Sequence, residues 1–248
     1  MKKFVALSAA VAAFGFVSVA NAADMPTKMP VKASPIAVPY NWTGWYVGLN
    51  AGGAWGTTKA TDNLATNGAA WVTNGASWTS RPTGFTGGAQ AGYNWQMNNF
   101  VVGVEADVGY LGVRGTGNYP LLPTTFVDTK GGLFTTARLR GGIAFDNVLV
   151  YATGGYFGAD FGSSVQTTAA APVQLLNNGK TGFQSGWTAG GGVEYGINRM
   201  WTVKGEWLYY SVPNKQVGNN FAGGGAIVQF FSIQNTGNIA RLGVNYRF

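Results

Sequence analysis

Few side chains in this 248-residue chain could do chemistry, and most of those are carboxylates and their basic partners. Eight of them fall within segments of alternating polarity, always on the polar side: Glu105, Asp107, Glu194, Glu206, Arg138, Arg140, Lys204 and Arg241. A carboxylate next to a guanidinium makes strong charge-assisted hydrogen bonds, whereas an isolated buried one shifts its pKa or draws in water. Four acids against four bases therefore predict a mutually compensating network.

Catalytic alternatives find little support in the residue types. The chain has no Cys and no His, which excludes a disulfide, a thiolate metal site, a cysteine nucleophile and the commonest general base. A glycosidase-type pair of acids would need an open cleft. We expect no enzyme, no catalytic residue, no metal and no cofactor.

The N-terminus has the pattern of an export signal. Lys2 and Lys3 precede an uncharged stretch that ends in small residues, which predicts a signal peptide over residues 1–22. Residues 23–41 hold four of the nine prolines and predict an extended linker before a single domain at 42–248.

The charge of the chain does not favour nucleic-acid binding. Removing the signal peptide with its two lysines leaves 16 − 2 = 14 basic against 9 acidic residues. The basic residues are scattered singly rather than gathered on one face, so nucleic-acid binding is not expected.

The rest of the chain predicts a membrane-spanning barrel. Charged residues are only 10% and no second long apolar run follows the signal, yet polarity alternates with period two in eight segments. In the first, Trp45, Val47 and Leu49 fall on one face, and the other segments lie near 85–95, 102–110, 136–145, 148–158, 187–195, 201–210 and 240–248. Lipid tolerates sheets only when they close. The register of the fifth segment stays open.

Aromatic residues near the ends of the apolar faces predict two interfacial girdles: Trp45, Trp55, Tyr93, Trp95, Tyr110, Trp187, Tyr195, Trp201, Trp207 and Tyr209. Trp45 and Trp55 would lie roughly 24 Å apart along the membrane normal. A soluble sandwich or lipocalin-like barrel is the alternative, but it would place the eight charges outside on a Gly-rich, weakly charged surface.

Connections alternate in length, short at 96–99, 146–147 and 198–200 and long at 57–82, 111–131, 159–181 and 211–235. The predicted fold is all-β: an eight-stranded antiparallel up-and-down transmembrane β-barrel with short periplasmic turns and four long external loops. The loops are slightly basic, with Lys59, Arg81, Arg114, Lys130, Lys180 and Lys215 against Asp62, Asp128 and Asp160. Contact with anionic lipopolysaccharide is a hypothesis that follows.

Eight strands enclose little more than their own side chains, which favours a network that fixes the interior. Many inward positions are Gly, however, so a thread of water and a selectivity filter remain the functional alternative.

Both ends of the domain carry a family resemblance. Residues 42–55, WTGWYVGLNAGGAW, resemble the opening strand of small outer-membrane immunogenic proteins of the opacity/porin-like β-barrel family. Residues 242–248, LGVNYRF, look like the family's C-terminal assembly signal, in which Gly243, Tyr246 and Phe248 would be recognised by the barrel-assembly machinery. The resemblance implies a surface-exposed antigenic barrel of the Gram-negative outer membrane that contributes to envelope integrity, with some relatives binding haem or forming weak pores.

The expected function is therefore a structural and surface-interaction role in the cell envelope, with antigenic loops. Outer-membrane lipid, lipopolysaccharide and the assembly machinery are the expected partners, with host or envelope partners reached through the loops. The alternatives are a narrow pore for small solutes and a surface binding protein, either an adhesin or a haem-capturing protein. Without His, haem ligation would fall to Tyr or Met.

Overall fold

The computed structural model describes residues 40–63, 75–119, 122–167, 175–176, 181–221 and 228–248. The predicted signal peptide and all but the last two residues of the predicted linker lie outside these ranges, as does Lys180. No helix among the described residues is long and apolar enough to cross a membrane.

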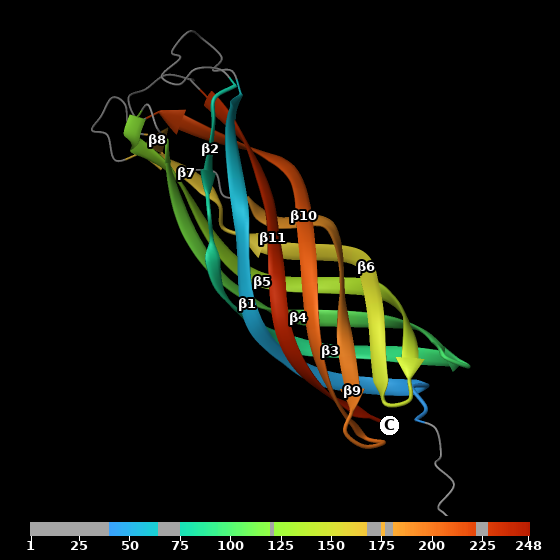
Figure 1. The fold of residues 1–248 in the computed structure, drawn as a ribbon. Helices are drawn as coiled ribbons and strands as arrows, with labels where there is room; N and C mark the ends of the chain where they lie inside the picture. Colours follow the sequence, from blue (N-terminus) through green and yellow to red (C-terminus); the bar gives the residue numbers. More distant parts are fainter. Residues whose placement is uncertain (1–39, 64–74, 120–121, 168–174, 177–180, 222–227) are drawn as a thin grey trace, which may run out of the picture. The chain divides into compact units, whose positions relative to one another are not determined.

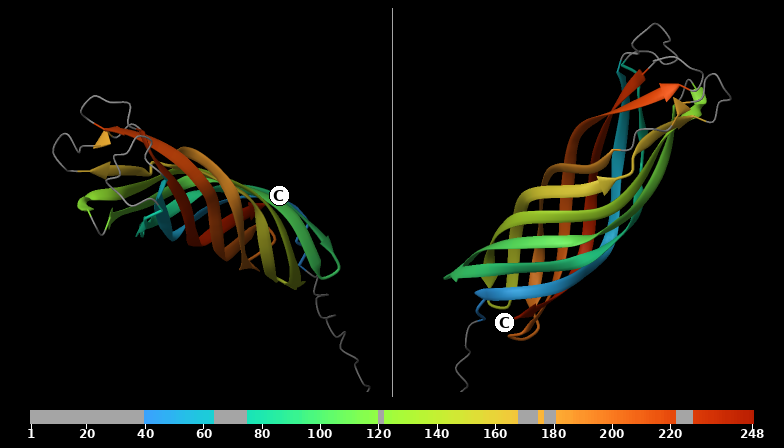
Figure 2. Two further views of the ribbon diagram at one scale, coloured as in Figure 1. Left: turned by 90° about the horizontal axis from the view of Figure 1, so that it is seen from above. Right: turned by 180° about the vertical axis from the view of Figure 1, so that it is seen from behind.

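Eleven strands form one antiparallel sheet: β1 (Gly44–Asn63), β2 (Ser77–Ser80), β3 (Thr83–Met97), β4 (Phe100–Tyr119), β5 (Leu122–Phe145), β6 (Val148–Phe161), β7 (Ser164–Thr167), β8 (Leu175–Leu176), β9 (Gly182–Gly196), β10 (Trp201–Phe221) and β11 (Val228–Arg247). Eight of them are long, and each pairs with the next in the order β1, β3, β4, β5, β6, β9, β10, β11. The strands are strongly tilted (Figures 1 and 2).

The sheet closes through β1 and β11, which pair from Tyr46 opposite Arg247 to Asn63 opposite Phe230. Closure removes the unpaired edges that lipid would not tolerate. The three short strands each lie beside a long one: β2 pairs with β1, β7 with β5 and β8 with β10. The predicted eight-stranded antiparallel barrel is confirmed.

Three tight connections and the C-terminus define one end of the barrel, which we call the turn end (Figure 1). β3 turns into β4 through Asn98 and Asn99, and β5 into β6 through Asp146 and Asn147. Asn98 and Asp146 have φ of 57° and 54°, a left-handed conformation that Asn and Asp tolerate better than other side chains. The third connection joins Gly196 to Trp201, so all three short turns lie where the sequence predicted them.

The strands run much further into the predicted external loops than expected. β1 continues to Asn63, β4 to Tyr119 and β10 to Phe221, while β5 begins at Leu122. The loop boundaries at 57–82, 111–131, 159–181 and 211–235 were therefore wrong. A strand of about 9–11 residues is enough to cross a bilayer, so strands such as the 20-residue β1 extend well beyond it.

Along the strands that continue beyond the membrane-facing part, the outward side chains change from apolar to polar, which explains the missed boundaries. On β1 the outward side chains are apolar up to Trp55 and then become Thr57, Lys59 and Thr61, while Ala60 is buried inside. We call the apolar outward region the belt. The part beyond it, the outer extension, comprises residues 57–63, 75–83, 114–119, 122–130, 160–167, 211–221 and 228–238. Where its side chains are described, the inner face carries large apolar groups such as Trp78, Phe231 and Ile233 beside buried polar ones such as Thr58 and Asn235, and the outer face is mostly polar. A polar outer face is the pattern of a water-exposed barrel.

The interior is filled by three apolar layers of buried side chains. One lies at the turn end and contains Trp42, Val101, Ala144, Leu149 and Tyr151. The second contains Ala54, Leu111, Val113, Phe134, Phe157, Ala159, Phe161, Leu208, Tyr210, Val212 and Ile239. The third, within the outer extension, contains Ala60, Trp78, Tyr119, Val127, Val165, Val217, Phe231 and Ile233.

The turn-end layer and the second layer together settle the register of the fifth segment, now β6. Its odd-numbered residues, including Leu149, Tyr151 and Phe157, point inward, and Val150 and Tyr156 point outward. Both faces of this strand carry large apolar side chains, so the sequence alternation that marks a face is lost.

The inward glycines make room for neighbouring side chains. Tyr46 lies opposite Gly92, Tyr151 opposite Gly192 and Tyr210 opposite Gly237 in register. A Cβ on Gly92 would overlap the Tyr46 hydroxyl and the Val104 carbonyl oxygen. These glycines therefore hold tyrosines flat against the wall, and the expectation that they leave space for water at these positions was wrong.

We predict that Gly92→Ala destabilises the barrel by about 1–3 kcal/mol, because the added methyl group overpacks a closed interior. Unfolding in urea, with the protein in phospholipid vesicles and followed by tryptophan fluorescence, measures the effect. Gly141→Ala is the matched control, because a Cβ on this outward glycine meets nothing within 4 Å. Equal midpoints for the two variants would contradict the packing described here.

Candidate functional site: a charge network inside the barrel

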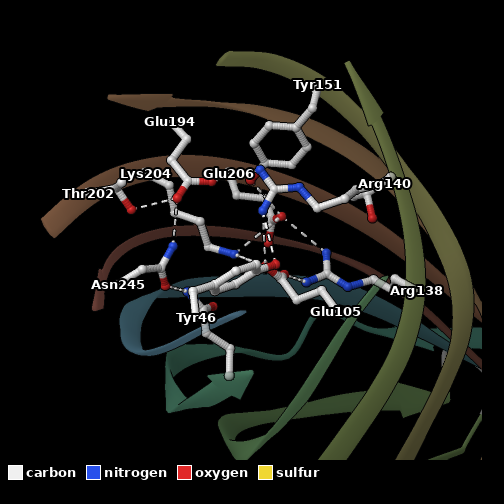
Figure 3. A network of polar contacts seen from close by, with 12 residues as sticks. Tyr46, Glu105, Arg138, Arg140, Tyr151, Glu194, Thr202, Lys204, Glu206 and Asn245 are labelled. Carbon is white, nitrogen blue, oxygen red and sulfur yellow. Dashed lines mark hydrogen bonds and ion pairs between the residues drawn. The ribbon is translucent and has the colours of Figure 1, made fainter. Parts of the chain in front are cut away.

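The eight charged residues that the sequence singled out all lie buried on the inner wall, between the turn-end layer and the second apolar layer. They come from β4, β5, β9, β10 and β11, and their charged groups converge at the barrel axis (Figure 3). The structure thus brings the whole set into one cluster.

Neighbouring strands provide the first pairs. Glu105 on β4 lies opposite Arg138 on β5, and the two form an ion pair. Arg138 Nη2 also lies 2.7 Å from Asp107 Oδ2. Between β10 and β11, Arg241 donates two hydrogen bonds to Glu206 Oε2, at 2.9 and 2.6 Å. Antiparallel register therefore juxtaposes acids and bases, as the alternation of these strands suggested.

Other pairs cross the interior. β4 and β10 lie on opposite sides of the eight-strand ring, yet Lys204 Nζ is 2.9 and 2.8 Å from the two Glu105 oxygens. Arg241 Nη1 reaches Asp107 Oδ1 at 2.8 Å, and Arg140 Nη2 reaches Glu194 Oε2 at 2.6 Å. The contacts of Lys204 with Glu105 and of Arg241 with Asp107 brace distant walls against each other, and Arg140 with Glu194 bridges β5 and β9 across β6.

Uncharged side chains complete the network, and sequence reasoning did not single them out as members. The Tyr46 hydroxyl donates to Glu105 at 2.7 Å, and the Tyr151 hydroxyl donates to Glu206 at 2.9 Å. Glu194 accepts from Thr202 at 2.5 Å and from Asn245 at 2.8 Å (Figure 3). For Tyr46, Thr202 and Asn245 the only sequence signal was a position on the polar face of the alternation, and Tyr151 had none, because the register of its segment was open.

The arrangement suits bracing better than chemistry. Each of the four carboxylates accepts from cations and from hydroxyl or amide donors, and four acids balance four bases. A buried charge is tolerated when it is paired and hydrogen-bonded in this way. No group of three or more His, Cys, Asp or Glu residues in the described ranges could hold a metal ion.

Residues just before β1 cover the turn end. The Trp42 indole is fully buried and donates from Nε1 to the Asp146 carbonyl oxygen at 3.0 Å. The Tyr40 hydroxyl donates to the Asn198 carbonyl oxygen at 3.1 Å. The Arg247 guanidinium lies 5.1 and 5.5 Å from the ring centres of Tyr40 and Trp42. Tyr40, within the predicted linker, and Trp42 therefore cover this end of the barrel.

The ten predicted girdle residues all lie on the outer face. Trp45 contacts Tyr93 with ring centres 5.0 Å apart, and Trp187 contacts Tyr209 at 5.5 Å. Most of them are large and exposed, which suits amphipathic rings at a membrane interface.

The three residues of the predicted assembly signal lie on β11 and directly after it. Tyr246 packs between Trp201 and Phe248, with ring centres 5.1 and 5.3 Å away, and Phe248 is exposed. Gly243 faces inward beside Lys204. Recognition by the assembly machinery stays a prediction.

A closed antiparallel barrel with an apolar outer belt and a charge-balanced interior is an integral membrane barrel of the bacterial outer-membrane type. The chain belongs to the outer membrane protein beta-barrel domain family, which it matches over residues 9–248.

Named relatives agree with this assignment. The chain is 35% identical over 250 residues to the 31 kDa outer-membrane immunogenic protein of Brucella melitensis, covering 94% of this chain and 95% of the relative. It is 29% identical over 253 residues to the 25 kDa outer-membrane immunogenic protein of Brucella canis, covering 100% and 99%. The protein is thus an outer-membrane β-barrel related to outer-membrane immunogenic proteins.

A solved structure supports the fold alone. OprG, an outer membrane protein of Pseudomonas aeruginosa, superposes with a TM-score of 0.57 at 12% identity, covering 84% of this chain and 98% of OprG. Outer-membrane barrels have short periplasmic turns, so the turn end faces the periplasm and the outer extension faces the outside.

Removing one member of the network should be costly. Arg138→Met leaves Glu105, Asp107 and Glu206 short of a cation, and we predict a loss of about 3–5 kcal/mol in unfolding free energy. Adding Asp107→Asn restores the balance between acids and bases and should recover part of that loss. Urea titrations in vesicles measure both effects. A double variant less stable than Arg138→Met would show that charge balance is not what holds the network.

Proposed function

We propose that this protein is a non-conducting barrel with a structural role in the outer membrane, and that it works through its outer surface rather than through its interior. The buried apolar layers that fill the interior on both sides of the charge network are the observation that carries this proposal.

The second apolar layer provides the strongest support. Phe134, Phe157 and Tyr210 come from β5, β6 and β10 and stack with ring centres 6.2 and 4.6 Å apart. All three are buried, as are Leu208 and Ile239 beside them. A row of stacked rings across the interior offers no polar path for an ion.

The periplasmic end supports the same conclusion. Trp42 donates hydrogen bonds to the Gln96 side chain and to the Asp146 carbonyl oxygen. It belongs to the same buried apolar cluster as Val101 and Leu149. A solute entering here would meet buried apolar side chains before it reached the charge network.

The outer extension supports a surface role. Polar strands continue beyond the belt, so the chain displays an ordered surface outside the membrane. The Brucella relatives are named immunogenic, and we extend to this protein the role of a surface antigen displayed on that extension.

Planar-bilayer recording tests the sealed interior. We predict that the wild-type protein shows no stable conductance steps at voltages where an added porin conducts. The double variant Phe157→Ala, Tyr210→Ala removes two stacked rings and should leak, provided that it folds to a heat-modifiable band on gels. Large stable steps from the wild-type protein would overturn the proposal and favour a porin.

A further inference from the structure

Four cations gather on one sector of the outer extension. Lys59 on β1, Arg81 between β2 and β3, Arg114 on β4 and Lys130 on β5 all point outward and are exposed. We call these four residues the cationic arc. The network inside the barrel does not involve them.

Strand register makes the arc continuous. Arg114 lies directly opposite Lys130, and its other neighbour is Thr83. Lys59 lies opposite Thr79. Because β2 and β3 keep one register along β1, Arg81 lies between Thr79 and Thr83, diagonal to Lys59 and Arg114. Diagonal neighbours on a sheet are about 7–8 Å apart, within reach of long side chains.

The arc is only partly compensated. Lys130 pairs with Asp128 at 3.2 Å, and Asp160 lies on the next strand. Within the described part of the chain, Lys59, Arg81 and Arg114 have no ion-pair partner. Like charges placed directly opposite each other on a sheet are destabilising, so Arg114 and Lys130 would gain from a bound anion.

Apolar side chains lie directly below the arc, toward the membrane. They are Trp55, Phe85, Tyr110 and Leu133, and Phe85 and Leu133 are 63% and 65% exposed. Trp55 on β1 lies opposite Thr83 on β3, which lies opposite Arg114 on β4, so the three share one cross-strand row. The surface therefore combines unpaired cations with an apolar face at the level where the outer girdle meets the headgroups.

The other side of the barrel differs at this height. At the level of the outer extension, only Asp160 and Lys215 are charged among the described outward residues of β6, β9, β10 and β11. Lys215 donates a hydrogen bond to the Thr181 carbonyl oxygen. Outward positions on β11 are neutral, such as Gln234 and Thr236. Of the five basic loop residues that the structure describes, all but Lys215 thus lie on one sector.

We propose that the cationic arc binds the phosphate groups of lipopolysaccharide in the outer leaflet, with its acyl chains on Phe85, Leu133 and their neighbours. Arginine matches phosphate geometry with paired donors, and two phosphates on one headgroup could span the diagonal from Arg81 to Arg114. The lipid would be held on β1 to β5 and not around the whole barrel.

This inference rests on the outer-surface role in the proposed function, but not on the sealed interior. A barrel that conducted ions could still bind lipid here, and a sealed one could fail to. Bilayer recording and lipid binding therefore report on the two proposals separately.

The test compares two variants that lose the same charge. Arg81→Gln, Arg114→Gln removes two members of the arc. Arg199→Gln, Lys215→Gln removes one cation at the turn end and one on the other sector, both exposed. Heat-modifiable gel migration verifies the folding of each variant.

Binding of diphosphoryl lipid A to the full barrel in detergent is measured by native mass spectrometry. We expect the arc variant to bind about tenfold more weakly or worse than wild type, and the control variant to bind within about twofold of it. Phe85→Ala should weaken binding of lipid A but leave the weaker binding of inorganic phosphate unchanged.

Further lipids separate the sources of the phosphate. Dephosphorylated lipid A should bind wild type and arc variant alike, and phosphatidylglycerol should bind more weakly than lipid A. Equal loss in the arc and control variants would overturn the proposal. Arginine-dependent binding of phosphatidylglycerol as tight as that of lipid A would overturn it in favour of a general anionic-lipid surface.

Discussion

Glu105 lies within 4 Å of four cations, Arg138, Arg140, Lys204 and Arg241, and accepts a hydrogen bond from Tyr46. Such a carboxylate can remain inside a membrane barrel only because its partners come from both neighbouring and opposite strands. The requirement for balance restrains the register of every strand that contributes a member. A slip of one residue would move those charges to the lipid face.

The same requirement explains how the interior is arranged along its length. The charged side chains of the network lie at one level, where their partners are, and buried apolar layers lie on either side of that level. Small residues opposite large ones let a narrow barrel hold tyrosines and phenylalanines without strain on the wall, as in the pairing of Tyr46 with Gly92. Beyond the belt the constraint relaxes, because water can solvate the outer face. There the outward side chains become mostly polar, and large apolar side chains turn inward beside buried polar residues such as Thr58 and Asn235.

Much of the fold could be predicted from sequence because the belt alternates cleanly. Segments such as 102–110 place valines on one face and Glu105 and Asp107 on the other, so strand number, turns and inward charges followed. The strands of the outer extension could not be predicted, because their outward side chains are polar and their Thr, Asn and Gly residues suit loops equally well. Leu149, Val150 and Tyr151 hid the register of β6, since both faces there are apolar. The contacts that cross the interior, such as Lys204 to Glu105, depend on closure, which no local pattern encodes.

The inversion of polarity at the belt can be measured most directly with single labels. The chain has no cysteine, so Leu139→Cys in the belt and Thr116→Cys in the outer extension each create a unique site. With a fluorescent label in vesicles, we predict that the Leu139 site is quenched by lipid-borne nitroxides and not by aqueous iodide, and that the Thr116 site shows the reverse. Quenching of the Leu139 site by iodide, with protection of the Thr116 site, would contradict this structure.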